Sequence, residues 1–213
     1  MSGRHKPDWA TLARTLGRVV DPIDRHPLTV PGEANPDALR PAAVLVPVVV
    51  SPDGPELLLT VRNQNLSSHP GQISFPGGRV DSGDRDVGHT ALREAEEELG
   101  IRPEDVSLLG SLALHATGTG YAVIPVLGLL APDYPYRPAA AEVAEVFHVP
   151  LAHVLDPTNH VTCEREYGGQ RRHYFEIWFN HYRIWGATAG MIVGLQQRLQ
   201  KMGTSHRLET AFN

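Results

Sequence analysis

The chain has 213 residues, of which 41% are hydrophobic and 20% are charged, a composition typical of one globular domain with a buried core and not of a disordered chain. Its formal net charge of −5, with no polybasic run, argues against a nucleic-acid binder. The single cysteine, Cys163, excludes an intramolecular disulfide and a cysteine-rich zinc site.

The chain shows no segment of the kind that enters or crosses a membrane. Its longest apolar runs fall well short of the roughly 20 residues that a spanning helix needs. Charged residues interrupt the N-terminal region, which therefore does not read as a secretory signal. We expect a cytoplasmic protein with no membrane partner.

Hydrophobic spacing and turn residues predict helices and strands in irregular succession. The predicted helices cover residues 8–20, 89–99 and 188–202. The predicted strands cover residues 42–50, 57–61, 72–75, 106–115, 121–130, 173–179 and 182–185. The pattern of residues 139–146 fits either a helix or a strand. This mixture, without strict strand–helix alternation, predicts an α/β (α+β) fold in which helices flank a mixed sheet.

The predicted organisation has two parts. Residues 1–41 combine the first helix with a connector that carries five prolines between positions 22 and 41. Residues 42–213 form the main domain and end in the last predicted helix. Two strand pairs within it, 42–50 with 57–61 and 106–115 with 121–130, read as hairpins.

The helix predicted over residues 89–99 carries an unusual density of acidic residues. Helical spacing places Ala91, Leu92, Ala95 and Leu99 on a stripe that faces the core. Three glutamates lie together beside that stripe, Glu94, Glu97 and Glu98, whereas Glu96 points elsewhere. Like charges at this spacing repel one another, so structure alone rarely requires them.

Three carboxylates on one helix face are the ligands that a hard divalent cation prefers. Mg²⁺ binds oxygen ligands and usually keeps waters and substrate phosphates in its shell. A solvated acidic helix with Arg93–Glu97 ion pairs is the alternative explanation of the same pattern. The adjacent Pro76-Gly77-Gly78 favours a binding site, because two glycines after a strand permit a tight turn and the close approach of a ligand.

These residues resemble the box of the Nudix hydrolase family. Its pattern is Gly, five residues, Glu, seven residues, Arg-Glu, an aliphatic residue, any residue, Glu-Glu, any residue, Gly and an aliphatic residue. The matching residues are Gly78, Arg93, Glu94, Glu97, Glu98, Gly100 and Ile101. Asp84 stands where the first Glu is expected, and eight residues rather than seven separate it from Arg93.

Two further stretches resemble the coenzyme A pyrophosphatases within that family. They are Leu58-Leu59-Thr60-Val61-Arg62 and Gly71-Gln72-Ile73-Ser74-Phe75-Pro76-Gly77-Gly78, and the lead-in Thr90 to Ala95 is also similar. The resemblance implies a Nudix fold, a curved mixed sheet sandwiched between helices. It also implies hydrolysis of the coenzyme A diphosphate to adenosine 3′,5′-bisphosphate and 4′-phosphopantetheine, and it raises the expectation of a homodimer.

The resemblance also implies roles for individual residues. Glu94, Glu97 and Glu98 would bind Mg²⁺ or Mn²⁺, with Arg93 orienting a carboxylate. A general base would come from a later loop, where Glu142 and Glu145 are candidates and Glu142 is preferred. The expected substrate-binding residues are Arg62, His69, Gly77 and Gly78.

Two other functions remain open from the sequence. A Nudix enzyme for another substrate, such as ADP-ribose, would share the same box, and the loop after Arg62 lacks the second basic residue that the coenzyme A signature often carries. A non-catalytic Nudix module that binds a regulatory nucleotide usually loses box carboxylates. Glu94, Glu97 and Glu98 are all present here.

Overall fold

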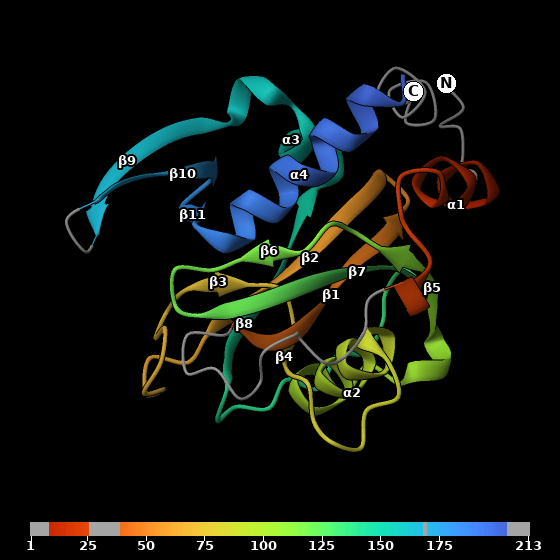
Figure 1. Ribbon diagram of the computed structural model, residues 1–213. Helices are drawn as coiled ribbons and strands as arrows, with labels where there is room; N and C mark the ends of the chain where they lie inside the picture. Colours follow the sequence, from red (N-terminus) through yellow and green to blue (C-terminus); the bar gives the residue numbers. More distant parts are fainter. Residues whose placement is uncertain (1–8, 26–38, 168–169, 204–213) are drawn as a thin grey trace.

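The computed structural model describes residues 9–25, 39–167 and 170–203, and within these ranges it contains one large and one small β-sheet (Figure 1). The large sheet runs in the order β3-β2-β1-β7-β5, with β4 on β1, β6 on β7 and β8 on β2. Its strands are β1 (Arg40–Ser51), β2 (Gly54–Arg62), β3 (Ile73–Ser74), β4 (Gly77–Arg79), β5 (Val106–Ser111), β6 (His115–Ala116), β7 (Tyr121–Leu130) and β8 (Val143–Pro150). Because β1 lies parallel to β7 and antiparallel to β2, the sheet is mixed, as predicted.

Helices cover both faces of this sheet, so that its central strands are buried on each side. Helix α2 (Val87–Leu99) packs on one face, while α1 (Trp9–Gly17), α3 (Leu151–Leu155) and α4 (Ala187–Lys201) lie on the other (Figure 1). Successive side chains of β1 point to opposite faces of the sheet. Leu45 packs in the core on the α2 side, and Val46 packs in the core on the α1 and α4 side. The sandwich of helices around a mixed sheet confirms the predicted fold class.

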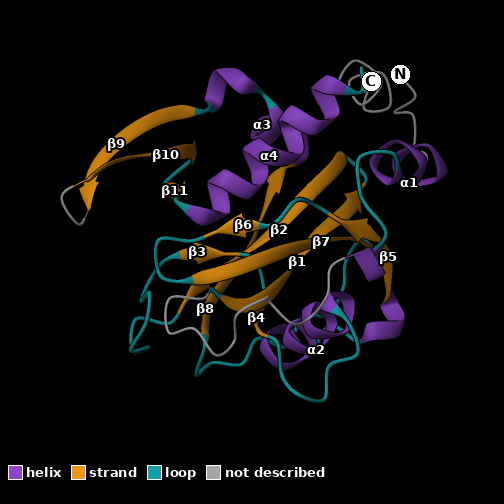
Figure 2. Ribbon diagram, in the orientation of Figure 1, coloured by secondary structure: helices purple, strands orange, loops and turns teal. Residues whose placement is uncertain are grey.

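The small sheet has the order β11-β10-β9 and projects beside α4 (Figure 2). Its strands are β9 (Val161–Tyr167), β10 (Gln170–Phe179) and β11 (Tyr182–Trp185). The last two match the strands predicted over 173–179 and 182–185. Strand β9 was not predicted, because Glu164, Arg165 and Glu166 interrupt its apolar alternation after Val161 and Cys163, and it pairs with β10 through the backbone.

Several predicted elements differ in detail from the structure. The ambiguous stretch 139–146 divides into a turn and the start of β8, and the predicted strand over 106–115 is broken between β5 and β6, both of which pair with β7. Helix α3 was not predicted. Gly77 and Gly78, expected in a tight turn, instead begin β4, which pairs with Ala43 and Val44 of β1.

Helix α1 contributes to the same core as the sheet, through the buried residues Leu12 and Leu16. Of the predicted connector 21–41, Ile23–Arg25 form a short 3-10 helix, and residues 26–38 lie outside the described ranges. Within the described ranges, the structure has no helix with both the length and the apolar character needed to span a membrane.

Candidate active site

Helix α2 is fixed at both ends and along one face, which sets the direction of its glutamates. Asp86 caps the first turn by accepting a hydrogen bond from the His89 backbone N–H at 2.8 Å. Gly100 ends the helix in the left-handed conformation, with φ of 66°. Ala95 and Leu99 are fully buried, as the predicted core stripe requires.

The four glutamates of α2 have very different exposure. Glu98 is buried, with only 4% of the residue exposed, and the side chain of Glu94 is 16% exposed. The side chain of Glu97 is 58% exposed and Glu96 also lies at the surface. Of the three predicted ligands, two are therefore drawn toward the protein and one lies at the rim.

Strand β4 lies directly against the inner two glutamates. A Cβ atom added to Gly78 would come within 2.4 Å of Oε1 of Glu94, so the absence of a side chain leaves the space that this carboxylate occupies. The backbone N–H of Gly77 hydrogen-bonds to Glu98. The group that approaches Gly78 in this structure is the Glu94 side chain, and the predicted approach of a ligand to the two glycines stays a prediction.

The pKa of Glu98 is raised to about 8, chiefly by its burial. The positive charge of Arg62 acts in the opposite direction, whereas the negative charges of Glu94 and Glu142 raise the pKa further. Burial also raises the pKa of Glu94, against the hydrogen bond from Arg93. A carboxylate cluster with raised pKa values is stabilised by any cation that enters it.

The ends of β2 and β8 bring Arg62 and Glu142 to this cluster. Arg62 is paired with Val143 across the two strands, and the backbone N–H of Asn63 donates to the Glu142 carbonyl at 2.8 Å. The turn before β8 is tied to α2 by a bond of 2.8 Å from the Ala139 N–H to the Glu98 carbonyl. Residues distant in sequence therefore converge on the C-terminal half of α2.

Arg62 carries an unused hydrogen-bond donor at this point. Its Nε is buried and has no hydrogen-bond partner among the described residues. A buried donor without an acceptor costs about 1–3 kcal/mol, so such a group in a native protein calls for an explanation, such as a catalytic role or a bound water or ion. An anionic ligand beside Glu98 would supply the missing acceptor.

Arg93 holds the cluster to the loop that precedes α2. Its Nε and Nη2 donate to the two oxygens of Asp84 at 3.1 Å each, a bidentate pair. Its Nη1 donates to Glu94 at 2.8 Å and to Glu97 at 3.2 Å. These bonds are compatible with the predicted orienting role of Arg93, which stays a prediction.

Asp84 received no role from the sequence, although it stands at the first acidic position of the box. Its side chain is buried and also accepts bonds from Thr90 Oγ1, His89 Nδ1 and the Asp81 N–H. Burial opposes its ionisation, but the bonds from Arg93 and these other donors hold its pKa well below its usual range. Its position in the box was the available signal.

His69 differs from the other predicted residues in its surroundings. It is exposed in the loop between β2 and β3, where its Nδ1 lies 2.9 Å from Oε1 of Gln72. The structure shows no contact between His69 and the glutamates of α2. Its substrate-binding role stays a prediction.

The carboxylate oxygens suit a hard cation as ligands, but in this structure they do not form a coordination site around one position. Within the described ranges, no three His, Cys, Asp or Glu side chains are arranged to hold a metal ion. Glu94 and Glu97 each accept from Arg93 through one carboxylate oxygen, Oε1 of Glu94 and Oε2 of Glu97, so an ion would be bound by the other oxygen of each. The candidate ligand atoms of this cluster are carboxylate oxygens, which bind Mg²⁺ or Mn²⁺ in preference to a soft metal.

A hollow of about 370 Å³ lies elsewhere on α2, along its N-terminal half. Its lining includes Asp24, Arg85, His89 and Leu92. None of the predicted site residues lines it, so it is separate from the carboxylate cluster.

Comparison with known proteins concerns the domain that carries these residues. The NUDIX domain family model matches residues 39–167. The protein from Cronobacter sakazakii called "Uncharacterized Nudix hydrolase NudL" is 45% identical over 153 residues, which cover 72% of this chain and 79% of that protein. Its namesake from Photorhabdus laumondii is 40% identical over 182 residues, which cover 84% of this chain and 97% of that protein.

Among solved structures, a MutT/nudix family protein from Enterococcus faecalis is similar in fold. It aligns with 97% of this chain and 80% of its own, with a TM-score of 0.50 and 14% identity. Such a likeness concerns the fold alone. Together with the matching domain and the two relatives, the acidic helix next to Gly78 identifies the chain as a member of the Nudix hydrolase family of pyrophosphohydrolases.

Proposed function

We propose that this enzyme hydrolyses the diphosphate of coenzyme A or its derivatives. The observation that carries the proposal is the convergence of Arg62, Glu94, Glu98 and Glu142 beside Gly78. Arg62 is the last residue of the stretch that resembles the coenzyme A pyrophosphatases, and its unpaired Nε is buried in this cluster. The sequence resemblance supports coenzyme A as the substrate, and the unpaired Arg62 donor beside the carboxylates supports the binding of its diphosphate there.

In this proposal Glu94, Glu97 and Glu98 hold Mg²⁺ or Mn²⁺. A cation bound there would neutralise the charge that develops on the phosphate oxygens, and it would lower the pKa of the attacking water. Arg62 binds the diphosphate with its unused donor. Arg93, fixed by Asp84, sets the directions of the Glu94 and Glu97 carboxylates.

Glu142 is the proposed general base. It is exposed on the turn before β8, and its charge acts on both Glu94 and Glu98, which places it at the edge of the same cluster. It takes a proton from the attacking water as the new P–O bond forms in line with the P–O bond that breaks. The products are adenosine 3′,5′-bisphosphate and 4′-phosphopantetheine.

One observation favours a second candidate, a Nudix enzyme that cleaves ADP-ribose. The loop from Asn63 to His69 contains no arginine or lysine, so the second basic residue that coenzyme A pyrophosphatases often carry there is absent. Both candidates use the same carboxylate cluster.

A substrate comparison tests the proposal. The protein is incubated with coenzyme A, ADP-ribose or NADH in the presence of Mg²⁺ or Mn²⁺, and the products are separated by chromatography. We expect the highest kcat/KM for coenzyme A, with release of adenosine 3′,5′-bisphosphate. A higher kcat/KM for ADP-ribose would move the assignment to the second candidate, and the absence of turnover with any of the three would refute both.

A further inference from the structure

A pair of arginines shares one tyrosine at the end of the sheet where β1, β4 and β7 meet. The guanidinium carbon of Arg40 lies 4.0 Å from the centre of the Tyr121 ring, and that of Arg79 lies 5.6 Å from it. Arg79 Nε also donates to the Tyr121 hydroxyl at 3.0 Å. Strand register explains the meeting, because Arg40 is paired with Tyr121 and Arg79 with Ala42.

Two positive groups held around one ring repel each other unless an anion lies between or beside them. In the described part of the chain, neither Arg40 nor Arg79 has a carboxylate oxygen within 4.0 Å. The bonds that these side chains do make are to neutral groups, the Tyr121 hydroxyl and the Thr119 carbonyl. Among the described residues, these bonds use two of the ten N–H groups of the two guanidiniums, and the other eight are candidates for binding a ligand.

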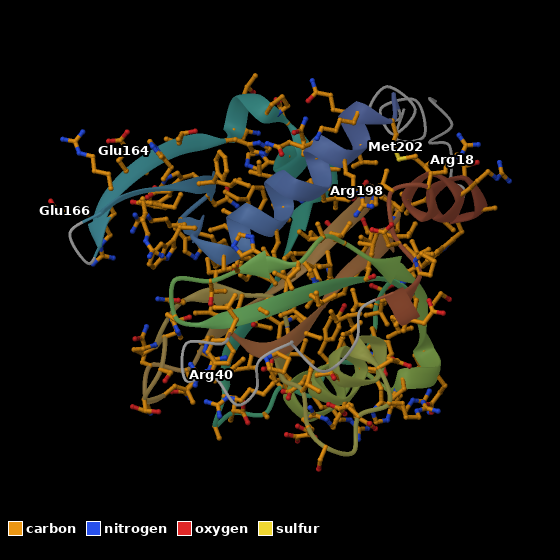
Figure 3. All side chains as sticks on the ribbon, viewed as in Figure 1. Arg18, Arg40, Glu164, Glu166, Arg198 and Met202 are labelled. Atoms are coloured by element: carbon orange, nitrogen blue, oxygen red, sulfur yellow. The ribbon has the colours of Figure 1, made fainter. Side chains whose placement is uncertain are left out.

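Tyr121 also reduces the conformational entropy that the two arginine side chains would lose when a ligand binds. Contact with the ring and the bond to its hydroxyl restrict both long side chains before any ligand arrives. Both arginines are exposed, and Figure 3 shows Arg40 at the edge of the molecule far from Arg198 and Met202. The pair is therefore a pre-organised, accessible, doubly positive site.

The position of Arg79 connects this site to the catalytic cluster. Arg79 directly follows Gly78, whose missing side chain makes room for Glu94, and its carbonyl accepts a bond from Arg93 Nη2 at 3.0 Å. The Arg79 side chain itself extends to Tyr121 on β7. Tyr121 packs with the core on the α1 and α4 side of the sheet, whereas Gly78 faces Glu94 of α2, so a substrate that bound both groups would pass around the end of β4.

We propose that Arg40, Arg79 and Tyr121 bind a phosphate monoester that the substrate carries outside its scissile diphosphate. A monoester has a charge of about −1.5 to −2 at pH 7, which matches two guanidiniums. Given the proposed function, on which the identity of the ligand rests, this group is the 3′-phosphate of coenzyme A. The site then selects coenzyme A against nucleotides that lack that phosphate.

Calorimetry in metal-free buffer tests the site without any turnover. The probes are adenosine 3′,5′-bisphosphate and AMP, which differ by the 3′-phosphate. We expect the wild-type protein to bind the bisphosphate at least tenfold more tightly than AMP. The double variant Arg40→Gln with Arg79→Gln should bind both equally, with the affinity for AMP unchanged.

Two further variants sharpen the comparison. Arg165→Gln, in exposed β9, removes the same charge outside the pair and should behave as wild type. Tyr121→Phe keeps the ring but loses the bond to Arg79, and should reduce the preference two- to threefold. The inference is wrong if wild type fails to bind or prefer the bisphosphate, or if the double variant keeps the preference or loses both probes equally.

Turnover separates this inference from the proposed function. If the wild type cleaves coenzyme A and the double variant keeps the same ratio of kcat/KM for coenzyme A to dephospho-coenzyme A, the arginine site is wrong and the function stands. If the wild type does not cleave coenzyme A but the arginines still confer the preference for the bisphosphate, the site stands and the function is wrong.

Discussion

The carboxylate of Glu94 occupies the space in which a side chain at position 78 would lie. A Cβ atom at Gly78 would be 2.4 Å from Oε1 and 2.6 Å from Oε2 of this glutamate. The backbone of Gly78 has no positive φ, so the backbone permits a larger residue, and the atoms nearest to an added Cβ all belong to Glu94. The glycine therefore serves the direction of a site residue more than the folding of β4.

This relationship makes Gly78→Ala a test of site geometry. The methyl group displaces a flexible carboxylate, so we expect a fall in kcat of about 10- to 100-fold, the size of effect that small misplacements of a catalytic group produce. Thermal unfolding should change little. Gly83→Ala is the control, because a Cβ there meets nothing within 4 Å, and it should leave both measurements unchanged. Full activity in Gly78→Ala would show that the position of Glu94 is unimportant.

The pair of Arg93 and Asp84 anchors the acidic helix to its loop. Asp84→Asn removes the charge that Arg93 grips with two bonds while keeping the shape of the side chain. We expect a loss of about 2–4 kcal/mol in the free energy of unfolding, measured in urea. Asp86→Asn is the matched control, since asparagine caps a helix as well as aspartate does. Equal stability of the two variants would contradict the anchoring role.

The same residue predicts a dependence of stability on acid. The pKa of Asp84 is lower in the native state than in the unfolded chain, where it is about 3.9. Its stabilising contribution is therefore complete above that value and is lost as the pH falls below about 4 toward the native pKa. Urea midpoints between pH 7 and pH 3 should fall less steeply for Asp84→Asn than for wild type. Parallel curves would contradict this assignment.

The contribution of Glu98 to stability depends on pH in the opposite direction from that of Asp84. Its pKa in the native protein is raised to about 8 from an ordinary 4.5, so the metal-free native state loses stability as the pH rises between these values. Glu98→Gln removes this loss, and in EDTA at pH 8 it should raise the free energy of unfolding by about 1–3 kcal/mol. At pH 5 the two proteins should be similar.

The gain in stability should be accompanied by a loss of function. With saturating Mg²⁺, Glu98→Gln should turn over at least about 100-fold more slowly, because an amide replaces a carboxylate ligand. A variant that is both active and more stable would show that Glu98 is merely a strained buried acid.

The general base is the least constrained part of the site, and a pair of variants distinguishes the two candidates. Glu142→Gln should lower kcat by about 10²- to 10⁴-fold with little effect on stability, because Glu142 is exposed. Glu145 instead accepts a hydrogen bond from the Tyr182 hydroxyl, so Glu145→Gln should leave kcat nearly unchanged. The reverse order of effects would transfer the role to Glu145.

The helical period predicted, from the sequence, which face of α2 is buried and therefore where its glutamates point. Ala95 and Leu99 are buried at the spacing of the core stripe, and this places Glu94 and Glu98 against β4 and Glu96 in solvent. Local spacing was sufficient here because a helix of fixed period converts one buried face into the directions of all its residues.

Interactions across long sequence separations were not predictable in the same way. No local pattern indicates that Gly77 would pair with Val44, or that Arg79 would reach Tyr121 forty-two residues later. Strand β9 was missed for a related reason, because its pairing with β10 is made by the backbone and its charged residues Glu164, Arg165 and Glu166 interrupt the apolar alternation.

The most direct test of the account is to locate the cation. A crystal of the wild-type protein with coenzyme A and Mn²⁺, measured at an X-ray wavelength where manganese scatters anomalously, should show the ion between the carboxylates of Glu94 and Glu98 and in contact with the diphosphate. An ion bound elsewhere, with both carboxylates still turned away from it and toward Arg93 or Arg62, would contradict the central claim.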